Sequence, residues 1–462
     1  MESLLIKRIL SLSWLIDLDS INVIIVLIHK PHLACHKDIM NHQGLSKWQL
    51  TAIIIGNVLE WYDFVVFSFM LVFISRLFFP SQDPLSALLS TTATFGISFC
   101  LRPLGGVIFG LFADRYGSKS AMLVIIGLMA FATFLIVCTP TYRDIGIYAT
   151  YILIIARMLQ GLATSGEFGT AINLLIRMAP EKERYFYSSW QMFGQLLALA
   201  MGTVVGLLMT VYFTTETIEN WAWRLPFLLG LLIMPVGILL RKTFKHSASS
   251  LIEKNALNPK FWDLAPFNVI CGMGLVAGAS VPLYLIINYM PTYAHLYLHF
   301  SLNEAYFCCF SGLCAGLISV FFGGKLADRI NPVKLAILSL SGQLILAFPL
   351  YSYLLLAHQT ALFALIQIIM TALMGFYLAS FAPMIADLFP EFIQTTGISV
   401  SYNFSVMLFG GFAPFIVTWL IQSTGSPLAM LAYLMTGLSL ALIVCLSKVM
   451  IKSQMLASSA SG

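Results

Sequence analysis

The chain has 462 residues, of which 59% are hydrophobic and only 10% are charged. A soluble domain carries about 25% charged residues, so this composition excludes an ordinary soluble protein and predicts one that lies in a lipid bilayer. The net charge is +5, but the basic residues lie in short segments between apolar runs, which argues against a nucleic-acid partner.

Apolar runs of about 20 residues recur along the chain, and each is long enough to cross a bilayer as a helix. The runs are apolar on nearly every face and contain Gly and Pro, whereas barrel strands would alternate polar and apolar residues. We therefore expect an all-α membrane protein with about twelve transmembrane helices. Their predicted ranges are 48–75, 86–112, 120–138, 147–176, 187–213, 224–240, 265–294, 303–325, 333–356, 360–386, 396–421 and 428–447.

The predicted spans form two groups of six that sequence repeats relate to each other. GLFADR begins at Gly110 and GKLADR begins at Gly324, and the same shift of 214 residues carries Gly161 onto Gly375. We therefore predict two pseudo-symmetric six-helix bundles with a substrate site between them near the middle of the bilayer. The predicted parts are an extension at 1–47, an N-terminal half at 48–240, a cytoplasmic central loop at 241–263, a C-terminal half at 264–447 and a tail at 448–462.

The N-terminal extension is unusual, because its apolar stretch 9–28 carries Asp17 and Asp19 near the middle. A charge at the centre of a span costs about 2.5 to 3.5 kcal/mol, which disfavours a thirteenth span. Two interpretations remain open, an interfacial segment and a translation start at Met40.

The basic residues are distributed unevenly between the two ends of the predicted spans. If the first span starts in the cytoplasm, only Arg76, Arg143 and Arg224 fall outside, while the other basic residues of the loops fall inside. Cytoplasmic loops concentrate Lys and Arg. We therefore expect both termini in the cytoplasm.

Five ionisable residues lie inside predicted spans, where each needs a partner or an aqueous cavity and marks function. They are Glu60, Asp63, Arg102, Arg157 and Glu167. Glu60 and Asp63 share one helical face with Asn57. Two carboxylates so close do not both ionise cheaply in a low dielectric, so one is expected to take up and release a proton. The alternative is that they pair with the arginines and only hold helices together.

The predicted fourth span carries a polar stripe, because Arg157, Gln160, Thr164 and Glu167 fall within an arc of about 80° on a helix. This stripe is expected to face a cavity. Arg157 would then bind a substrate carboxylate or neutralise Asp63, and a structural ion pair with Glu167 is the alternative.

The candidate site residues fall into three groups. The proton-coupling candidates are Glu60, Asp63 and Glu167. The candidate substrate ligands are Asn57, Arg102, Arg157, Gln160, Gln191, Asn288, Tyr289, Tyr402 and Asn403; for those from Gln191 onward, packing or helix–helix hydrogen bonding is the alternative. The gating candidates are Asp114, Arg115, Asp328 and Arg329, because a carboxylate at a cytoplasmic helix end can cap a neighbouring helix.

Motifs of catalysis are missing from the sequence. It contains no GxxxxGK[ST] phosphate loop, no HExxH and no GxSxG, so neither ATP drive nor enzymatic activity is expected. The eight cysteines lie mostly inside apolar runs without CxxC spacing. We therefore expect no metal site and no cofactor.

Four segments carry a family resemblance: GNVLEWYDF at 56–64, RPLGG at 102–106, GLFADRYG at 110–117 and RMLQGLATSGEFG at 157–169. Through them the chain resembles the metabolite:proton symporters of the major facilitator superfamily, which include proline/betaine, α-ketoglutarate, citrate and shikimate permeases. The resemblance implies proton-driven uptake by rocking of two six-helix halves in a bacterial cytoplasmic (inner) membrane. It also implies family roles for Glu60, Asp63, Arg102, Arg157 and Glu167.

The sequence thus predicts a secondary active symporter for a small organic acid or zwitterion. A proton would move through the region of Glu60 and Asp63 while the substrate crosses by alternating access. The expected partners are the substrate, protons and the bilayer, and one chain supplies the whole pathway. An exchanger or uniporter of the same fold and a sensor that binds without transporting are the alternatives. The loop after Asp114 reads YGSKS, which is less basic than the family pattern and weakens the gating prediction there.

Overall fold

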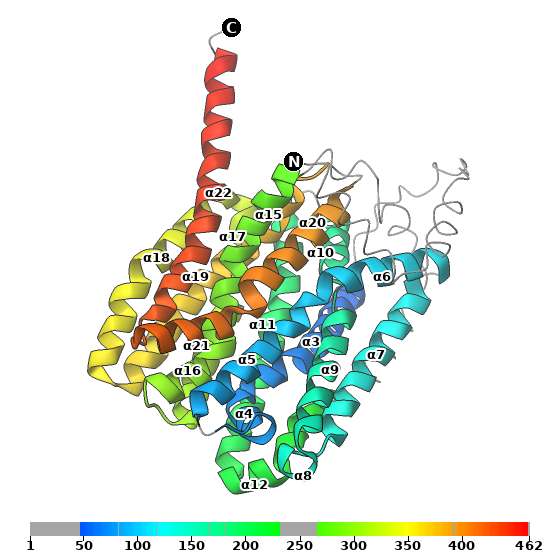
Figure 1. Ribbon diagram of the computed structural model, residues 1–462. Coiled ribbons are helices and arrows are strands. Elements are labelled where there is room, and N and C mark those ends of the chain that lie inside the picture. Colours follow the sequence, from blue (N-terminus) through cyan, green and yellow to red (C-terminus); the bar gives the residue numbers. More distant parts are fainter. Residues whose placement is uncertain are drawn as a thin grey trace, which may run out of the picture. The chain divides into compact units, whose positions relative to one another are not determined.

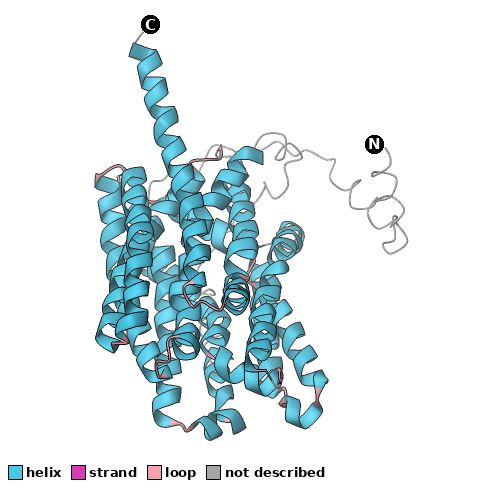
Figure 2. Cartoon of the chain, turned by 60° about the vertical axis from the view of Figure 1, so that its left-hand side comes forward, coloured by secondary structure: helices cyan, strands magenta, loops and turns pink. Residues whose placement is uncertain are grey.

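The computed structural model describes residues 47–81, 83–116, 118–165, 167–180, 182–231, 266–390 and 393–460. In this part of the chain every regular element is a helix and no strand occurs (Figure 1, Figure 2). The expected all-α architecture is therefore confirmed. Residues 1–46 of the predicted extension and the whole predicted central loop lie outside the described residues.

The described helices fall on either side of residues 232–265. The N-terminal half contains α3 (Lys47–Phe69), α4 (Leu71–Phe78), α5 (Pro84–Cys100), α6 (Arg102–Tyr116), α7 (Ser118–Cys138), α8 (Tyr142–Ile145), α9 (Ile147–Ala163), α10 (Glu167–Met178), α11 (Arg184–Tyr212), α12 (Thr215–Asn220) and the turn η1 (Ala222–Arg224). The C-terminal half contains α15 (Pro266–Pro282), η3 (Leu283–Tyr289), α16 (Met290–Tyr297), α17 (Leu302–Arg329), α18 (Pro332–Ala357), α19 (Thr360–Ala386), α20 (Gln394–Ser405), η5 (Val406–Gly411), α21 (Ala413–Thr424) and α22 (Ala429–Ala460).

The described residues contain helices at all twelve predicted spans. Eight helices are long and apolar enough to cross a membrane, and the bent pair Ile54–Phe69 and Leu71–Phe78 makes a ninth. Three shorter apolar helices fall at the predicted third, fourth and sixth spans, namely Val124–Cys138, Ile147–Ala163 and Ala222–Leu231. Helices therefore occur at every predicted span and in the predicted order, and eight or nine of them have the length and composition to cross a membrane by themselves.

The predicted fourth span, 147–176, consists of two helices, because α9 ends at Ala163 and α10 begins at Glu167. The hydroxyl of Thr164 donates to the carbonyl of Gln160 at 3.1 Å. The predicted polar stripe is consequently not one face of a single helix.

The last segment long and apolar enough to cross a membrane is Ala429–Ser447, which agrees with the predicted end near residue 447. Helix α22 continues beyond this segment to Ala460. No Gly or Pro follows Gly437 within this helix, so nothing in its sequence interrupts it.

The two halves meet along extended helix contacts. Helix α11 packs along α17, and α5 packs against η5 and α21. A small residue brings the first pair close, because a Cβ atom on Gly324 would lie 2.5 Å from the Oγ atom of Ser189.

The helix bundle has two ends, the Arg76 end and the Asp328 end. The Arg76 end holds α8, α12 and α16, at the bottom of Figure 1. The Asp328 end holds the end of α17, the start of α11 and the extension of α22, at the top of Figure 1.

Candidate functional site

Asp63 lies at the centre of a buried hydrogen-bond network in the N-terminal half. Its side chain is 0% exposed, and its Oδ2 atom accepts hydrogen bonds from Thr133 Oγ1 at 2.5 Å and from Gln160 Nε2 at 3.1 Å. Gln160 Nε2 also donates to Thr133 Oγ1 at 3.0 Å. Side chains from α7 and α9 thus hold a carboxyl group that α3 presents.

Arg157 joins this network through Gln160. Its Nη1 atom donates to Gln160 Oε1 at 2.6 Å. Because a guanidinium only donates, the amide oxygen faces Arg157 and the amide nitrogen is left to donate to Asp63. Among the described residues, no ion pair joins Arg157 to Asp63 directly. The positive and negative groups are therefore coupled through one amide.

Aromatic rings surround the two buried arginines of the N-terminal half. The guanidinium carbon of Arg157 lies 4.4 Å from the ring centre of Phe67 and 4.7 Å from that of Phe64. The guanidinium carbon of Arg102 lies 4.4 Å from the ring centre of Phe99 and 4.5 Å from that of Phe64. A desolvated cation over a ring face gains about 2 kcal/mol. The rings thus stabilise both charges without occupying the N–H donors.

Arg102 lines a pocket between the two halves. The whole lining is Asn57, Glu60, Trp61, Phe64, Arg102, Thr164, Phe168, Gln191 and Tyr402. Arg102 is only 1% exposed, and its Nε and Nη2 atoms have no hydrogen-bond partner in the described structure. Buried donors without an acceptor are costly. This arginine therefore presents two N–H groups suited to an anionic ligand.

This central pocket is closed in the structure. Its volume is about 10 Å³, which is room for about one water molecule. The rings of Phe168 and Tyr402 stack across the two halves with their centres 3.6 Å apart and an interplanar angle of 10°. Asn57 and Gln191 bond to each other, with Gln191 Nε2 donating to Asn57 Oδ1 at 3.1 Å. A small organic molecule would enter only after these groups separate.

Two hydrogen bonds join the halves between the central pocket and the Arg76 end. Helices α3 and α4 meet at an angle of 63°. The bend leaves the carbonyl of Phe69 outside the helical hydrogen-bond ladder, and the hydroxyl of Tyr306 in α17 donates to it. One residue earlier, Ser68 donates to Asn288 Oδ1 in η3 at 2.8 Å.

Two carboxylates join neighbouring helices at the Asp328 end. Asp328 accepts hydrogen bonds from the backbone N–H groups of Tyr185 and Phe186 at 2.8 and 2.9 Å. These groups lie in the first turn of α11, where backbone donors lack partners within the helix. Arg184 forms an ion pair with Asp387 at 2.7 Å. Asp328 has the expected capping geometry, and its gating role stays a prediction.

The remaining predicted residues lie away from the pocket lining or outside the described residues. Asn403 donates to the carbonyl of Ser165 at 3.0 Å, which joins the halves. The hydroxyl of Tyr289 pairs with that of Thr418 at 2.5 Å within the C-terminal half. Arg329 is exposed. The side chains of Asp114, Arg115 and Glu167 are not among those described.

Four residues of the central pocket and of the hydrogen-bond network around Asp63 were not singled out from the sequence, namely Trp61, Phe64, Thr133 and Phe168. Trp61 and Phe64 directly follow Glu60 and Asp63, so their positions were a usable signal. A lone threonine such as Thr133 in an apolar span carries none. Within the described part of the chain, no group of three or more His, Cys, Asp or Glu side chains could hold a metal ion.

Comparison with known proteins gives matches in sequence and in structure. The family model of the Major Facilitator Superfamily matches residues 53–400. A citrate-proton symporter of Klebsiella pneumoniae is 30% identical over 378 residues, which cover 80% of this chain and 84% of the relative. A glycine betaine/proline/ectoine/pipecolic acid transporter of Dickeya dadantii (strain 3937) is 29% identical over 398 residues, 82% of this chain and 79% of the relative.

A solved structure shares the arrangement of helices. The crystal structure of a D-xylose-proton symporter has a TM-score of 0.67 and 17% identity, and the match covers 86% of this chain and 96% of that one. At this identity the likeness concerns the fold alone.

Proposed function

Because the chain belongs to the Major Facilitator Superfamily, we propose that it imports a small carboxylate-bearing metabolite together with protons. Its family and relatives are transporters, so the chain is a secondary transporter and not an enzyme. It is a multi-pass membrane protein with the helix arrangement of its superfamily.

The buried carboxyl group of Asp63 is the observation that carries the proposed proton coupling. It takes two side-chain donors and reaches Arg157 only through Gln160. When a proton neutralises Asp63, the buried positive charge of Arg157 loses its negative counterpart. The aromatic rings around Arg157 still stabilise that charge, so protonation does not leave it without a partner. The repeat shift of 214 residues puts Ala277 and Thr371 at the positions of Asp63 and Arg157. The proposed proton site therefore belongs to the N-terminal half alone.

The free donors of Arg102 support a substrate that carries a carboxylate. A guanidinium matches a carboxylate by two parallel hydrogen bonds, and two donor atoms of Arg102 have no partner in the described structure. Citrate, glycine betaine, proline, ectoine and pipecolic acid, which the names of the two relatives contain, all carry a carboxylate. Glu60 and Gln191, which line the same pocket, are proposed to orient the rest of the substrate.

Coupling arises if protons and substrate both favour the state with closed ends. Protonation of Asp63 would weaken its bond from Gln160 and so change how α9 is held on α3. Substrate at Arg102 would draw the two sides of the central pocket together. Each ligand then favours the same closed state, through which the protein passes between the state open at one end and the state open at the other.

The distribution of basic residues supports an orientation with both termini in the cytoplasm. Arg76 pairs with Glu219, Arg143 lies in α8, and Arg224 donates to the carbonyl of Val137. All three belong to the Arg76 end, which we therefore assign to the outside of a bacterial inner membrane. A single chain supplies the whole pathway, so a monomer is proposed to be functional.

The Thr133→Val variant is expected to slow proton-driven uptake by about tenfold. The change keeps the side-chain volume but removes one donor to Asp63. A hydrogen bond to a charged group contributes about 1.5 to 3 kcal/mol, and about 1.4 kcal/mol corresponds to a factor of ten. Initial uptake rates in vesicles at matched protein levels measure the effect. The control is Thr203→Val, whose hydroxyl bonds only to Leu199 on its own helix; equal losses in both variants would argue against a specific role.

Uptake by reconstituted protein tests the function itself. Vesicles receive labelled citrate, glycine betaine, proline, α-ketoglutarate or shikimate, with and without an inward proton gradient. We expect at least one of them to accumulate only under the gradient. Uptake that needs internal substrate and ignores the gradient would identify an exchanger. Binding without accumulation under any condition would identify a sensor.

A further inference from the structure

A second and larger pocket opens at the Arg76 end. Its volume is about 260 Å³, against about 10 Å³ for the central pocket. Its walls come from α4, the end of α11 and α12 in the N-terminal half, and from α16 and the start of α17 in the C-terminal half. The pocket therefore lies where the two halves face each other, and it is large enough for a small metabolite.

This second pocket, lined by Arg76, His295, Thr215, Asn303 and their neighbours, is called the outer pocket, and its lining favours an anion. Arg76 and His295 are the ionisable residues among its lining side chains, and none of the lining side chains is acidic. Thr215 and Asn303 add neutral polar groups. The Nδ1 atom of His295 donates to the carbonyl of Phe300 at 3.0 Å, because a carbonyl only accepts. The guanidinium of Arg76 supplies the permanent positive charge of this pocket, and a positive charge in a concave site raises the local concentration of anions.

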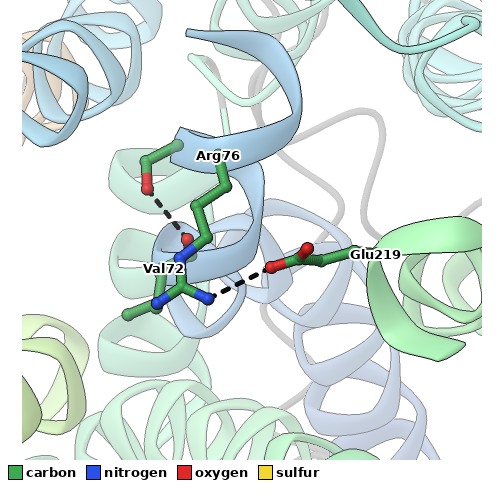
Figure 3. Close-up of polar contacts among 4 residues, drawn as sticks. Val72, Arg76 and Glu219 are labelled. Carbon is green, nitrogen blue, oxygen red and sulfur yellow. Dashed lines mark hydrogen bonds and ion pairs between the residues drawn. The ribbon is translucent and has the colours of Figure 1, made fainter. Parts of the chain in front are cut away.

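Arg76 is placed to bind a solute carboxylate. Its side chain is 53% exposed, and its Nη1 atom lies 3.1 Å from Glu219 Oε1 (Figure 3). An exposed ion pair of this kind contributes little to stability. A carboxylate can therefore share or replace Glu219, because a guanidinium has five donors and binds carboxylates in a bidentate manner.

The outer pocket is separate from the central one. Arg76 and Glu60 are sixteen residues apart on the first span, which is about 24 Å along a helical path at 1.5 Å per residue. The bonds from Tyr306 to Phe69 and from Ser68 to Asn288 lie between the two pockets.

We propose that the outer pocket is a binding site that receives the carboxylate of an incoming substrate, with Arg76 as the anion ligand. The substrate waits there until the two bonds between the halves break and the central pocket opens. The role of this site in uptake depends on the proposed function, whereas binding of a carboxylate to the site does not depend on it.

Equilibrium binding of labelled citrate to the purified full-length protein in detergent tests the site without transport. In protein carrying Arg102→Gln, which lacks the central anion ligand, we expect citrate binding to persist. Adding Arg76→Gln should weaken it at least fivefold, and Arg76→Lys should fall between, because lysine keeps the charge but lacks the planar fork. If the double variant does not fold, Arg76→Gln alone should remove the part of the citrate binding that Arg102→Gln leaves intact.

Arg143→Gln is the matched control for these measurements. Arg143 is an exposed arginine of α8 at the same end, and it does not line the outer pocket. We expect this variant to bind citrate as the unmodified protein does. Equal weakening in Arg143→Gln and Arg76→Gln would show only a general effect of surface charge and would overturn the site. Unchanged binding when Arg76→Gln is added to Arg102→Gln would overturn it as well.

Uptake kinetics add a second readout. Arg76→Gln should raise KM for a carboxylate substrate about fivefold with little change in the maximal rate, whereas Glu219→Gln, which frees Arg76, should lower KM. A lower maximal rate at unchanged KM would instead assign Arg76 a structural role and refute the site. If no substrate accumulates but Arg76→Gln still weakens citrate binding, the proposed function fails and the outer site stands.

Discussion

Vesicles containing the Asp63→Asn variant are expected to lose gradient-driven accumulation of substrate completely. Asparagine has nearly the same shape as aspartate and keeps an acceptor for Thr133, but it does not take up a proton. A gradient of about two pH units supplies about 2.7 kcal/mol for each proton, which supports about 100-fold accumulation of a zwitterion. The variant should therefore fall from about 100-fold accumulation to equal concentrations on both sides.

Exchange of labelled for unlabelled substrate should survive in the same variant, because exchange needs no net proton movement. This separates a lost proton site from a misfolded protein. Asp144→Asn is the control: hydrogen bonds from the Thr141 side chain and backbone lower the pKa of the Asp144 carboxyl group, which lies exposed in α8. That group therefore stays ionised at working pH, and accumulation should be normal. Accumulation that persists in Asp63→Asn would move the proton site elsewhere, with Glu60 as the next candidate.

The Gly161→Ala variant is expected to destabilise the N-terminal half strongly. A Cβ atom at this position would lie 1.6 Å from the carbonyl oxygen of Ser98 in α5. The obstacle is backbone, so α5 and α9 would have to separate. Overpacking of a buried contact costs about 1 to 3 kcal/mol or more. We expect the melting temperature of the purified protein to fall by several degrees, and the bond between Arg157 and Ser98, at 3.4 Å, to be lost.

Gly127→Ala in α7 is the matched control, because a Cβ atom there would meet nothing within 4 Å. Alanine favours a helix over glycine by about 1 kcal/mol, so this variant should melt at the same temperature or slightly higher. Thermal unfolding followed by intrinsic fluorescence in detergent compares the two. Equal melting temperatures for both variants would show that α5 and α9 do not need this close contact.

The buried network shows how far sequence reasoning reached into the site. Asp63, Arg157 and Gln160 were identified as candidates because charged and amide groups inside apolar runs are conspicuous. The sequence left open whether Arg157 pairs with Asp63 or with Glu167. The structure links Arg157 to Asp63 through Gln160 and adds Thr133. These bonds connect α3, α7 and α9, and no local pattern specifies which faces of three helices meet.

The candidate substrate ligands illustrate the same limit. Arg102, Asn57, Gln191 and Tyr402 come together around the central pocket although they lie on four different helices. Tyr289 was predicted by its polarity alone, and its hydroxyl instead pairs with Thr418. Their roles in binding substrate remain predictions that uptake measurements can test.

Hydropathy along the chain was enough to predict an all-α membrane protein and the order of its spans, while the repeated GLFADR and GKLADR segments predicted two related groups of spans. The reason is physical: each span must be long and apolar enough for the bilayer and must satisfy its backbone hydrogen bonds within itself. The partner of each buried polar group, by contrast, depends on contacts between distant segments. Asp63 and Gln160 are 97 residues apart in sequence and 3.1 Å apart in space, so only the packed helices bring them together.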